Sequence, residues 1–396
     1  MKHNTLEYLM ASNLADTMEE ALDIMACVPL IDGHNDFPHL IRAFYDSKLD
    51  DRFERNKHLA GHVDLQRLLR GRSGGIFWST YVDCPTEDDF SDSTHFEPLR
   101  DTLQQIDLVH RLVELYEDKL AVAYQADDIM RIFSQGKVAS LIGVEGLHQI
   151  GNSTSVLRMY HKLGVRYVTL AHNKNNRYAD SATAREPAHG GLSREGRAIV
   201  KEMNRIGMII DLSHASEATM ISTLENSVAP VVFTHSSCHA LVENPRNVSD
   251  VILDKLKENN GIIMISLIPP FTCSDPTVAD VDNVVDHILH AAKKIGFNHI
   301  GLGSDYDGML KAVNGVEDVS QWPNLVATML SRGIKRKDVE KVIGLNIIRV
   351  LKDVEEVAKK ARVWPVLEDE VKQLWNENFR AFVRNEYPDA ERDYIR

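Results

Sequence analysis

The segment 28–37, which reads Val-Pro-Leu-Ile-Asp-Gly-His-Asn-Asp-Phe, places a histidine and an aspartate two positions apart, at His34 and Asp36. The apolar residues before them predict a short β-strand that ends in this polar pair. Alternate side chains of a strand point to the same face, so the imidazole and the carboxylate can reach one cation. This pair of donors suits zinc or a similar divalent ion. Alone, His-x-Asp is a weak signal, because the polar end of a strand commonly meets only water.

Further along the chain, five more apolar runs end in an ionisable residue. These residues are Glu145, His172, His214, His235 and Asp305. Any one histidine at such a position is usually hydrogen bonded within a loop rather than bound to a metal. Burying so many ionisable groups together without a cation would be costly, however. The repeated pattern therefore predicts a metal centre built from several strand ends.

The order of predicted elements indicates how these strand ends could meet. Predicted strands begin near Leu30, Gly75, Lys137, Val165, Gly207, Pro230, Gly261 and His299. Apolar periodicity predicts helices over 63–69, 99–116, 156–163, 192–206, 217–224 and 281–295, with closing helices over 325–330, 339–342 and 346–358. Eight strands that alternate with helices fit an α/β fold of the TIM (β/α)8 barrel type. Active sites of such barrels lie at the C-terminal ends of the strands.

The remaining segments extend this barrel without adding a second domain. We expect one domain over residues 1–396, with a barrel core at about 28–310 and a C-terminal helical extension at about 320–396, because no linker rich in Pro, Gly or Ser divides the chain. Residues 1–26 have the spacing of an amphipathic helix. The long polar loop 173–191 is a candidate lid.

Composition excludes several classes of function. Lys and Arg number 45 against 58 Asp and Glu, a formal charge of −13, and no basic run is present that would bind nucleic acid. No apolar run is long enough to span a membrane, and the N-terminus does not read as a secretory signal. Four cysteines without a Cys-x-x-Cys motif indicate reduced thiols. We therefore expect a cytoplasmic protein.

Six short motifs, spread in order over residues 28–310, resemble those of the membrane (renal) dipeptidase family of zinc metallopeptidases. They are Asp32-Gly-His-Asn-Asp36, Val144-Glu-Gly146, Asp211-Leu-Ser-His214, Thr234-His-Ser-Ser237, Asn247-Val-Ser-Asp250 and Gly303-Ser-Asp-Tyr-Asp-Gly308. The resemblance implies a TIM barrel of the metal-dependent hydrolase type with a binuclear zinc centre. It also implies a homodimer, which is common in that family.

Carried over by position, the resemblance assigns five metal ligands. His34 and Asp36 resemble the ligands of one Zn²⁺ ion, and His214 and His235 resemble those of the second. Glu145 resembles the carboxylate that bridges both. A negative bridge lets two dications lie roughly 3.5 Å apart, where a shared water loses a proton near neutral pH and becomes the nucleophile.

The resemblance also assigns three residues to the substrate. Asp305 resembles the acid/base residue, although a capping, ion-pairing or ligand role would also explain a carboxylate there. His172 resembles the histidine that contacts the substrate carbonyl and stabilises the oxyanion. Arg246 resembles the arginine that binds the substrate's terminal carboxylate, and a surface ion pair is the alternative for it.

The chain also departs from the animal members of the family. The segment 264–270 lacks the Asn and Tyr expected there, so substrate contacts from that loop are open. Lys174 replaces a cysteine that in secreted relatives pairs with one near Cys84, which fits a reducing compartment. Four residues near the motifs are expected to support the ligands rather than bind metal. They are His39, His148, His239 and Asp307.

The sequence thus predicts a zinc-dependent dipeptidase that hydrolyses L-x dipeptides. It resembles the cytosolic fungal members, some of which act on Cys-Gly adducts in gliotoxin-type, sulfur-bearing secondary-metabolite pathways. One alternative is another amidohydrolase-type reaction, such as lactone, β-lactam or deamination chemistry, although many of those sites use His-x-His and a carboxylated lysine. A non-catalytic metal-binding scaffold is the other, and the presence of Asp305, His172 and Arg246 argues against it.

Overall fold

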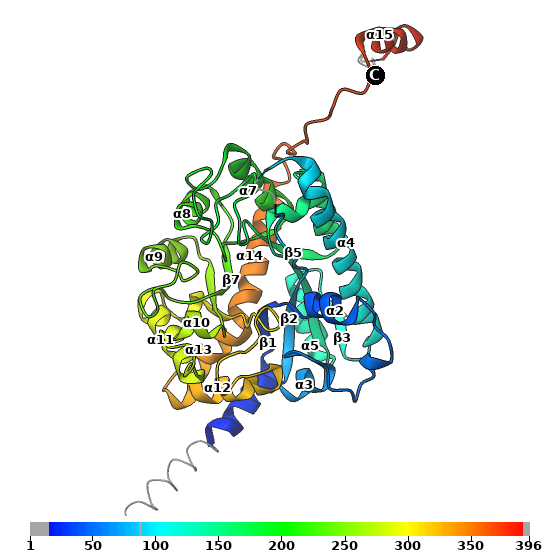
Figure 1. Ribbon diagram of the computed structural model, residues 1–396. Helices are drawn as coiled ribbons and strands as arrows, with labels where there is room; N and C mark the ends of the chain where they lie inside the picture. Colours follow the sequence, from blue (N-terminus) through cyan, green and yellow to red (C-terminus); the bar gives the residue numbers. More distant parts are fainter. Residues whose placement is uncertain (1–15, 87–88, 391–396) are drawn as a thin grey trace, which may run out of the picture.

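The computed structural model describes residues 16–86 and 89–390, and the strands in this part form one parallel sheet. Eight of them are β1 (Leu30–Asn35), β2 (Ser73–Ser79), β4 (Val138–Val144), β5 (Val165–Thr169), β6 (Ile209–Asp211), β7 (Val232–Ser236), β8 (Ile262–Ile265) and β9 (Ile300–Leu302). Their order is β2-β1-β9-β8-β7-β6-β5-β4, and pairing of β2 with β4 closes the circle. The predicted (β/α)8 barrel is therefore confirmed (Figure 1).

A ninth strand, β3 (Leu120–Val122), lies outside this circle and was not predicted. It pairs in parallel with the first residues of β4, starting with Leu120 opposite Val138. The later residues of β4 pair with β5 instead, so β3 and β5 share one edge of the same strand. Three residues are too few for the alternation of a strand to be visible in the sequence.

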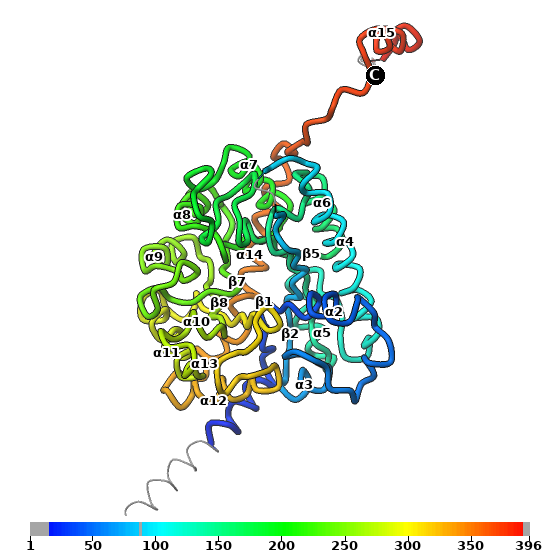
Figure 2. Tube along the Cα trace, in the orientation of Figure 1, coloured from blue at the N-terminus to red at the C-terminus, as the bar shows by residue number. Residues whose placement is uncertain are grey.

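Helices surround the barrel and cover its apolar strands (Figures 1 and 2). Their bounds are α2 (Phe37–Tyr45), α3 (Leu65–Arg70), α4 (Asp92–Leu115), α5 (Ala126–Ser134), α6 (Thr154–Lys162), α7 (Arg194–Ile206), α8 (Glu217–Asn226), α9 (Asp250–Glu258), α10 (Pro269–Thr272), α11 (Val281–Ile295), α12 (Trp322–Ser331), α13 (Arg336–Glu340) and α14 (Asn346–Ala361). Serine caps begin several of them: the side chains of Ser153, Ser193 and Ser216 each accept a hydrogen bond from a first-turn backbone N–H.

The sequence-based helix boundaries differ from the structure at specific residues. The helix predicted over 281–295 is confirmed as α11, whereas α4 begins at Asp92 rather than Leu99 and continues through Pro98. The prediction rested on apolar spacing from Leu99 onward, and a proline normally disfavours the helix interior, so nothing in the local pattern indicated the earlier start. Helices α2, α5 and α9 were not predicted, although the capping box of Gln125 and Asp128 marks the start of α5.

Both ends of the described chain are helical. Residues 16–27 form the described part of the predicted N-terminal helix, and the rest of that prediction, residues 1–15, lies outside the described residues. After α14, Asp369 accepts hydrogen bonds from the backbone and side chains at the start of α6. The chain then leaves the barrel and ends in α15 (Glu377–Glu386), which projects away from it (Figure 2). Within residues 16–86 and 89–390, no helix combines the length and apolarity needed to cross a membrane.

Truncation after residue 369 is expected to leave the barrel intact. Every residue of α15 is at least partly exposed to solvent, so its removal takes almost no buried apolar surface from the fold. We expect the free energy of unfolding to change by less than about 0.5 kcal/mol, as for other changes that leave the core untouched. Chemical denaturation of the full and truncated chains checks this. A large loss of stability would show that the extension belongs to the barrel domain.

Candidate metal centre

The five predicted ligands meet at the C-terminal end of the barrel. Glu145, the residue after β4, lies at the centre: its Oε1 atom is 3.4 Å from His34 Nε2, 3.1 Å from His214 Nε2 and 3.4 Å from His235 Nε2. Asp36 also lies beside His34, with its Oδ2 3.3 Å from His34 Nε2. All five side chains are buried.

One detail of the sequence-based geometry is wrong. We expected Asp36 to share a strand face with His34, but β1 ends at Asn35 and Asp36 is the N-cap residue of α2. Its backbone N–H donates to the carbonyl of Tyr306, which ties this turn to the segment after β9. Asp36 therefore reaches the site because the chain turns into α2 at this residue, and not because alternate side chains of a strand share one face.

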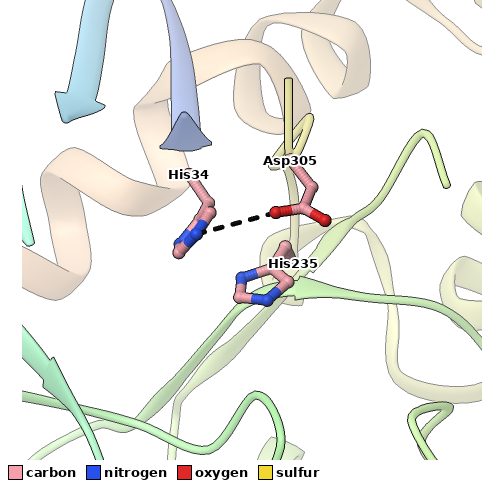
Figure 3. A group of neighbouring side chains, drawn as sticks. All are labelled: His34, His235 and Asp305. Carbon is pink, nitrogen blue, oxygen red and sulfur yellow. Dashed lines mark ion pairs between the residues drawn. The ribbon is translucent and has the colours of Figure 1, made fainter. Parts of the chain in front are cut away.

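Among the described residues, three groups of side chains bring their potential ligand atoms within 4.8 Å of one another. The groups are His34 with Asp36 and Glu145, Glu145 with His214 and His235, and His34 with His235 and Asp305. Glu145 belongs to the first two groups, so a carboxylate shared between two cations is sterically available. Figure 3 shows the third group, in which Asp305 Oδ1 lies 3.7 Å from His34 Nε2.

The hydrogen bonds of the histidines leave the correct nitrogen available to a cation. His34 Nδ1 lies 2.7 Å from the hydroxyl of Tyr167, and His235 Nδ1 lies 3.0 Å from that of Thr234. When each Nδ1 donates to its hydroxyl oxygen, each Nε2 keeps a lone pair that faces Glu145. Within the described chain, His34 Nε2 is buried without a hydrogen-bond partner, although carboxylate oxygens surround it. A cation would satisfy this atom.

The pKa values of the buried side chains also favour a cation at this site. Burial lowers the pKa of His214 and of His235 well below the usual value, and nearby cationic groups add to this, so both rings are neutral, as metal ligands must be. Burial raises the pKa of Glu145 to about 7 and, together with the adjacent Asp36, raises that of Asp305 well above its usual range. Burial thus disfavours the charged form of both carboxyl groups, and divalent cations would stabilise that form.

Two buried aspartates, not identified as functional from the sequence, hold the strand ends in place. Asp32 accepts hydrogen bonds from the backbone N–H of His34 and from both the N–H and the hydroxyl of Ser304. It thereby joins β1 to the residue before Asp305. Asp211 plays the same part between β6 and β7, accepting from the backbone N–H groups of Ser213 and Thr234. Their places in the Asp-x-His and Asp-x-x-His motifs were the available signal.

Tyr167 was also missed, because in the sequence it looks like an ordinary buried residue of β5. Its ring fills the space beside Gly143 of β4, where a Cβ atom would overlap the ring. Its hydroxyl contacts His34, 133 positions earlier in the chain. Partners of this kind orient metal-ligating histidines and fix their tautomer.

Replacing Gly143 with alanine is therefore expected to disturb the centre from a distance. The added methyl group must displace the Tyr167 ring, which we expect to cost about 1–3 kcal/mol of stability. Loss of the contact with His34 should weaken metal affinity by about 10–100-fold. Metal titration and denaturation measure the two effects. Tyr167→Phe is the matched control: it should weaken metal affinity without the packing penalty, and unchanged affinity in both variants would contradict this role for Tyr167.

The three residues assigned to the substrate also lie at this end of the barrel. His172 Nε2 is 3.9 Å from Glu145 Oε1, and its ring lies 4.6 Å from that of Tyr81. Asp305, at the turn after β9, has a left-handed φ of 62°, unusual for a non-glycine residue and compatible with a functional site. Arg246 is buried, lies over the Phe271 ring, and lines a cavity of about 370 Å³ with His214 and Asp305.

The four residues that we expected to support the metal ligands make different contacts. His148 Nε2 lies 2.9 Å from the carbonyl oxygen of Val82, and Asp307 Oδ1 accepts from the backbone N–H of His62. His39 packs its ring 4.9 Å from that of Tyr81. The three ligand groups contain none of these residues among the described part of the chain. His239 lies further along, where its backbone N–H donates to the carbonyl of Val248.

Comparison with known proteins decides the family. The family model of membrane dipeptidases, peptidase family M19, matches residues 18–364. The chain belongs to this family. It is 56% identical over 407 residues to dipeptidase tcpJ of Claviceps purpurea, covering 97% of this chain and 96% of that one. The expected likeness to fungal dipeptidases is therefore confirmed.

Solved structures agree with this assignment. The probable dipeptidase PvdM of Pseudomonas aeruginosa superposes with a TM-score of 0.79 at 22% identity, over 87% of this chain and all of that one, which shows the common fold. A metallopeptidase of Rhodobacter sphaeroides, solved with a phosphinate mimic of L-Ala-D-Ala, matches with a TM-score of 0.73 at 25% identity, over 83% of this chain and 99% of that one. The protein is thus a dipeptidase of the M19 metallopeptidase family.

Proposed function

We propose that this chain hydrolyses dipeptides with two zinc ions, one held by His34 and Asp36, the other by His214 and His235, with Glu145 shared. The observation that carries the proposal is the position of Glu145 Oε1 within 3.4 Å of three imidazole Nε2 atoms. When bound, the two ions supply an activated water and polarise the scissile carbonyl.

The chain's own side chains supply the remaining functions. Asp305 lies close enough to the ligands to take a proton from the attacking water and pass it to the leaving amine, and its raised pKa favours holding that proton. His172 faces the same space, so its Nε2 can donate a hydrogen bond to the oxyanion that forms from the carbonyl. Burial of the site strengthens both interactions.

Arg246 supports the choice of a dipeptide over a longer peptide. Burial lowers the pKa of its guanidinium to about 10, so the group remains cationic at neutral pH. Within the described chain, its buried Nη1 has no hydrogen-bond partner, and a free carboxylate is the group that a guanidinium binds best. A substrate whose carboxylate follows the scissile bond by one residue would satisfy it. The dipeptide mimic bound by the Rhodobacter sphaeroides relative is consistent with this.

Arg246→Met is expected to raise KM for dipeptides by roughly 10–100-fold, the usual value of a charged hydrogen-bonded pair. The wild type should discriminate strongly against dipeptide amides, which lack the negative charge, and the variant should lose this discrimination. Arg166→Met is the matched control, since Arg166 is also buried but donates to backbone carbonyl oxygens away from the site. Equal discrimination in both variants would mean that Arg246 does not bind the carboxylate.

A small panel of substrates tests the function itself. We expect L-x dipeptides to be cleaved, cleavage to stop with a chelator, and zinc to restore it. Turnover of a lactone, a β-lactam or an aminopurine instead of dipeptides would favour the alternative amidohydrolase chemistry. Stoichiometric metal without any turnover would favour a binding scaffold.

We further propose a cytoplasmic homodimer whose physiological substrates include Cys-Gly adducts. The cysteines support this compartment, because all four are free thiols. In addition, position 174, where secreted relatives have a cysteine that forms a disulfide with one near Cys84, is a lysine in this chain. Support for the substrate comes from the similarity to fungal dipeptidases such as tcpJ. Sedimentation measures the oligomeric state, and cell fractionation the location.

A further inference from the structure

The C-terminal arm, residues 370–390, carries an apolar stripe that faces solvent. In and beside α15, the spacing i, i+4, i+7, i+8 and i+12 of one helix face is occupied by Trp375, Phe379, Phe382, Val383 and Tyr387. The four aromatic side chains among them are between 45% and 66% exposed. Trp375 packs edge-on against Phe379, with ring centroids 5.0 Å apart. The stripe thus forms one surface, on a helix that projects away from the barrel (Figure 2).

A helix of this kind needs a partner. Helix α15 has 10 residues, fewer than the roughly 12–15 at which isolated helices become stable in water. Its ion pairs, from Arg380 and Arg384 to Glu377, lie within the helix itself. Asp369 fixes the start of the arm to the N-terminus of α6, and residues 370–376 can span up to about 25 Å beyond that point. The arm can therefore reach a second molecule.

The barrel carries an apolar patch along the same helix to which the arm is fixed. We call it the α4–α6 patch, and its side chains are between 40% and 48% exposed: Leu103, Tyr124, Met159 and Leu163. Tyr160 of α6 donates to the carbonyl oxygen of Leu99, one turn before Leu103, and His110 Nε2 lies 2.9 Å from the carbonyl oxygen of Leu163. The Tyr124 ring lies beside Gly164. These contacts make the four side chains neighbours on one face.

Area and charge favour a second copy of the chain as the partner of the arm. Aromatic side chains bury about 150–250 Å² each, so covering four half-exposed ones removes roughly 400 Å² of arm surface from water. Two exchanged arms, with the patches that they cover, would bury roughly 1,600 Å², the standard size of a specific interface. Glu386 lies within the stripe, and Lys162 is exposed between Met159 and Leu163, so the two surfaces also carry opposite charges.

A membrane is a poorer partner for the arm. Amphipathic helices that lie on membranes are rich in Lys and Arg on their polar face. The arm instead has three basic and four acidic residues, which are Lys372, Arg380, Arg384, Glu370, Glu377, Glu386 and Asp389. An arm without excess positive charge gains no attraction to anionic lipid.

We propose that the C-terminal arm docks on the α4–α6 patch of a second copy of this chain, so that two chains exchange arms around a two-fold axis. The inference rests on the proposed homodimer and names its interface. The arm takes no core surface from its own barrel, so the single chain stays folded without it. Docking adds stability only at concentrations at which the dimer forms.

Sedimentation velocity of the zinc-loaded full chain tests the exchange, and we expect a dimer at micromolar concentrations. Phe382→Asp in the stripe and Met159→Asp in the patch should each raise the dissociation constant by at least about 100-fold, because each places a charge against apolar side chains. Ala381→Asp is the matched control, since it adds the same charge at an exposed position of the arm outside the stripe. All three variants should hydrolyse Ala-Gly with kcat/KM within about twofold of wild type, which checks their fold.

A mixture of the two interface variants separates an exchanged arm from any other use of these residues. In a mixed pair, the intact arm of the Met159→Asp chain can dock on the intact patch of the Phe382→Asp chain. The mixture should therefore form a heterodimer at least about tenfold tighter than the homodimer of either variant. A mixture that dimerises no better than its components would overturn the pairing of arm and patch.

The remaining outcomes separate this inference from the proposals around it. A dimer that persists in both Phe382→Asp and Met159→Asp would overturn the exchange and leave the homodimer standing. A monomeric wild type would overturn both, whereas cleavage of Ala-Gly would still support the dipeptidase function. A monomeric wild type that co-sediments with phosphatidylserine vesicles, and loses this binding in Phe382→Asp, would assign the arm to a membrane and also overturn the exchange.

Discussion

Replacing Glu145 with glutamine is expected to abolish tight binding of both zinc ions and to lower kcat/KM by at least about 10³-fold. Glutamine keeps the size of the side chain but removes the negative charge that lies within 3.4 Å of His34, His214 and His235. In the proposed centre, this one change weakens a ligand of both ions, whereas a change at any of the histidines would remove a ligand from one. Metal content per protein and turnover are measured on the same preparation.

Glu202→Gln is the matched control for this result. Glu202 is a buried glutamate of α7 that accepts hydrogen bonds from Arg158 and Arg205, away from the metal ligands. Its replacement should reduce stability, because the partner arginines lose their counter-charge, while metal content and kcat stay near wild type. If Glu145→Gln kept two tightly bound ions, the carboxylate would not be shared between them.

The second large effect is expected from Asp305→Asn. We expect kcat to fall by about 10²–10⁴-fold, the usual contribution of general acid–base catalysis, with two zinc ions still bound. The amide of asparagine can neither accept the proton of the attacking water nor return it to the leaving amine. Asp305 Oδ1 lies 3.7 Å from His34 Nε2, and His34, Asp36 and Glu145 form a ligand group without Asp305.

A comparison at the same turn gives the control for Asp305. Asp307 lies two residues further along and uses its Oδ1 to accept from the backbone N–H of His62. Asp307→Asn should therefore act mainly on stability, with a loss of kcat well below that of Asp305→Asn. Loss of one zinc ion in Asp305→Asn would instead assign this carboxylate as a ligand, which is the role that the group of His34, His235 and Asp305 permits.

Much of the barrel could be predicted from the sequence because the relevant signals are local. Continuous apolar runs such as that of β4 mark buried parallel strands, and the regular spacing over 281–295 marks α11. The convergence of Glu145, His214 and His235 followed from the rule that strand C-termini meet at one end of a barrel. The short strand β3 and the passage of α4 through Pro98 depend on packing and pairing with distant segments, which leave little trace in a local pattern.

The missed parts of the site have the same explanation. Tyr167 is one more apolar-looking residue of β5 until the fold brings its hydroxyl to His34, and Gly143 is one more glycine until the ring beside it is known. A cavity of about 520 Å³ between the segment after β2 and the 173–191 loop was also missed, because these two segments are far apart in the chain. The roles proposed for Asp305, His172 and Arg246 toward the substrate came from family motifs and not from periodicity.

Anomalous diffraction at the zinc edge, from crystals of the zinc-loaded protein, is the most direct test of the metal centre. We predict two anomalous peaks, one beside His34 and Asp36 and one beside His214 and His235, each about 2.0–2.2 Å from an oxygen of Glu145. A single peak, or two peaks with the Glu145 carboxylate bound to only one of them, would contradict the shared site.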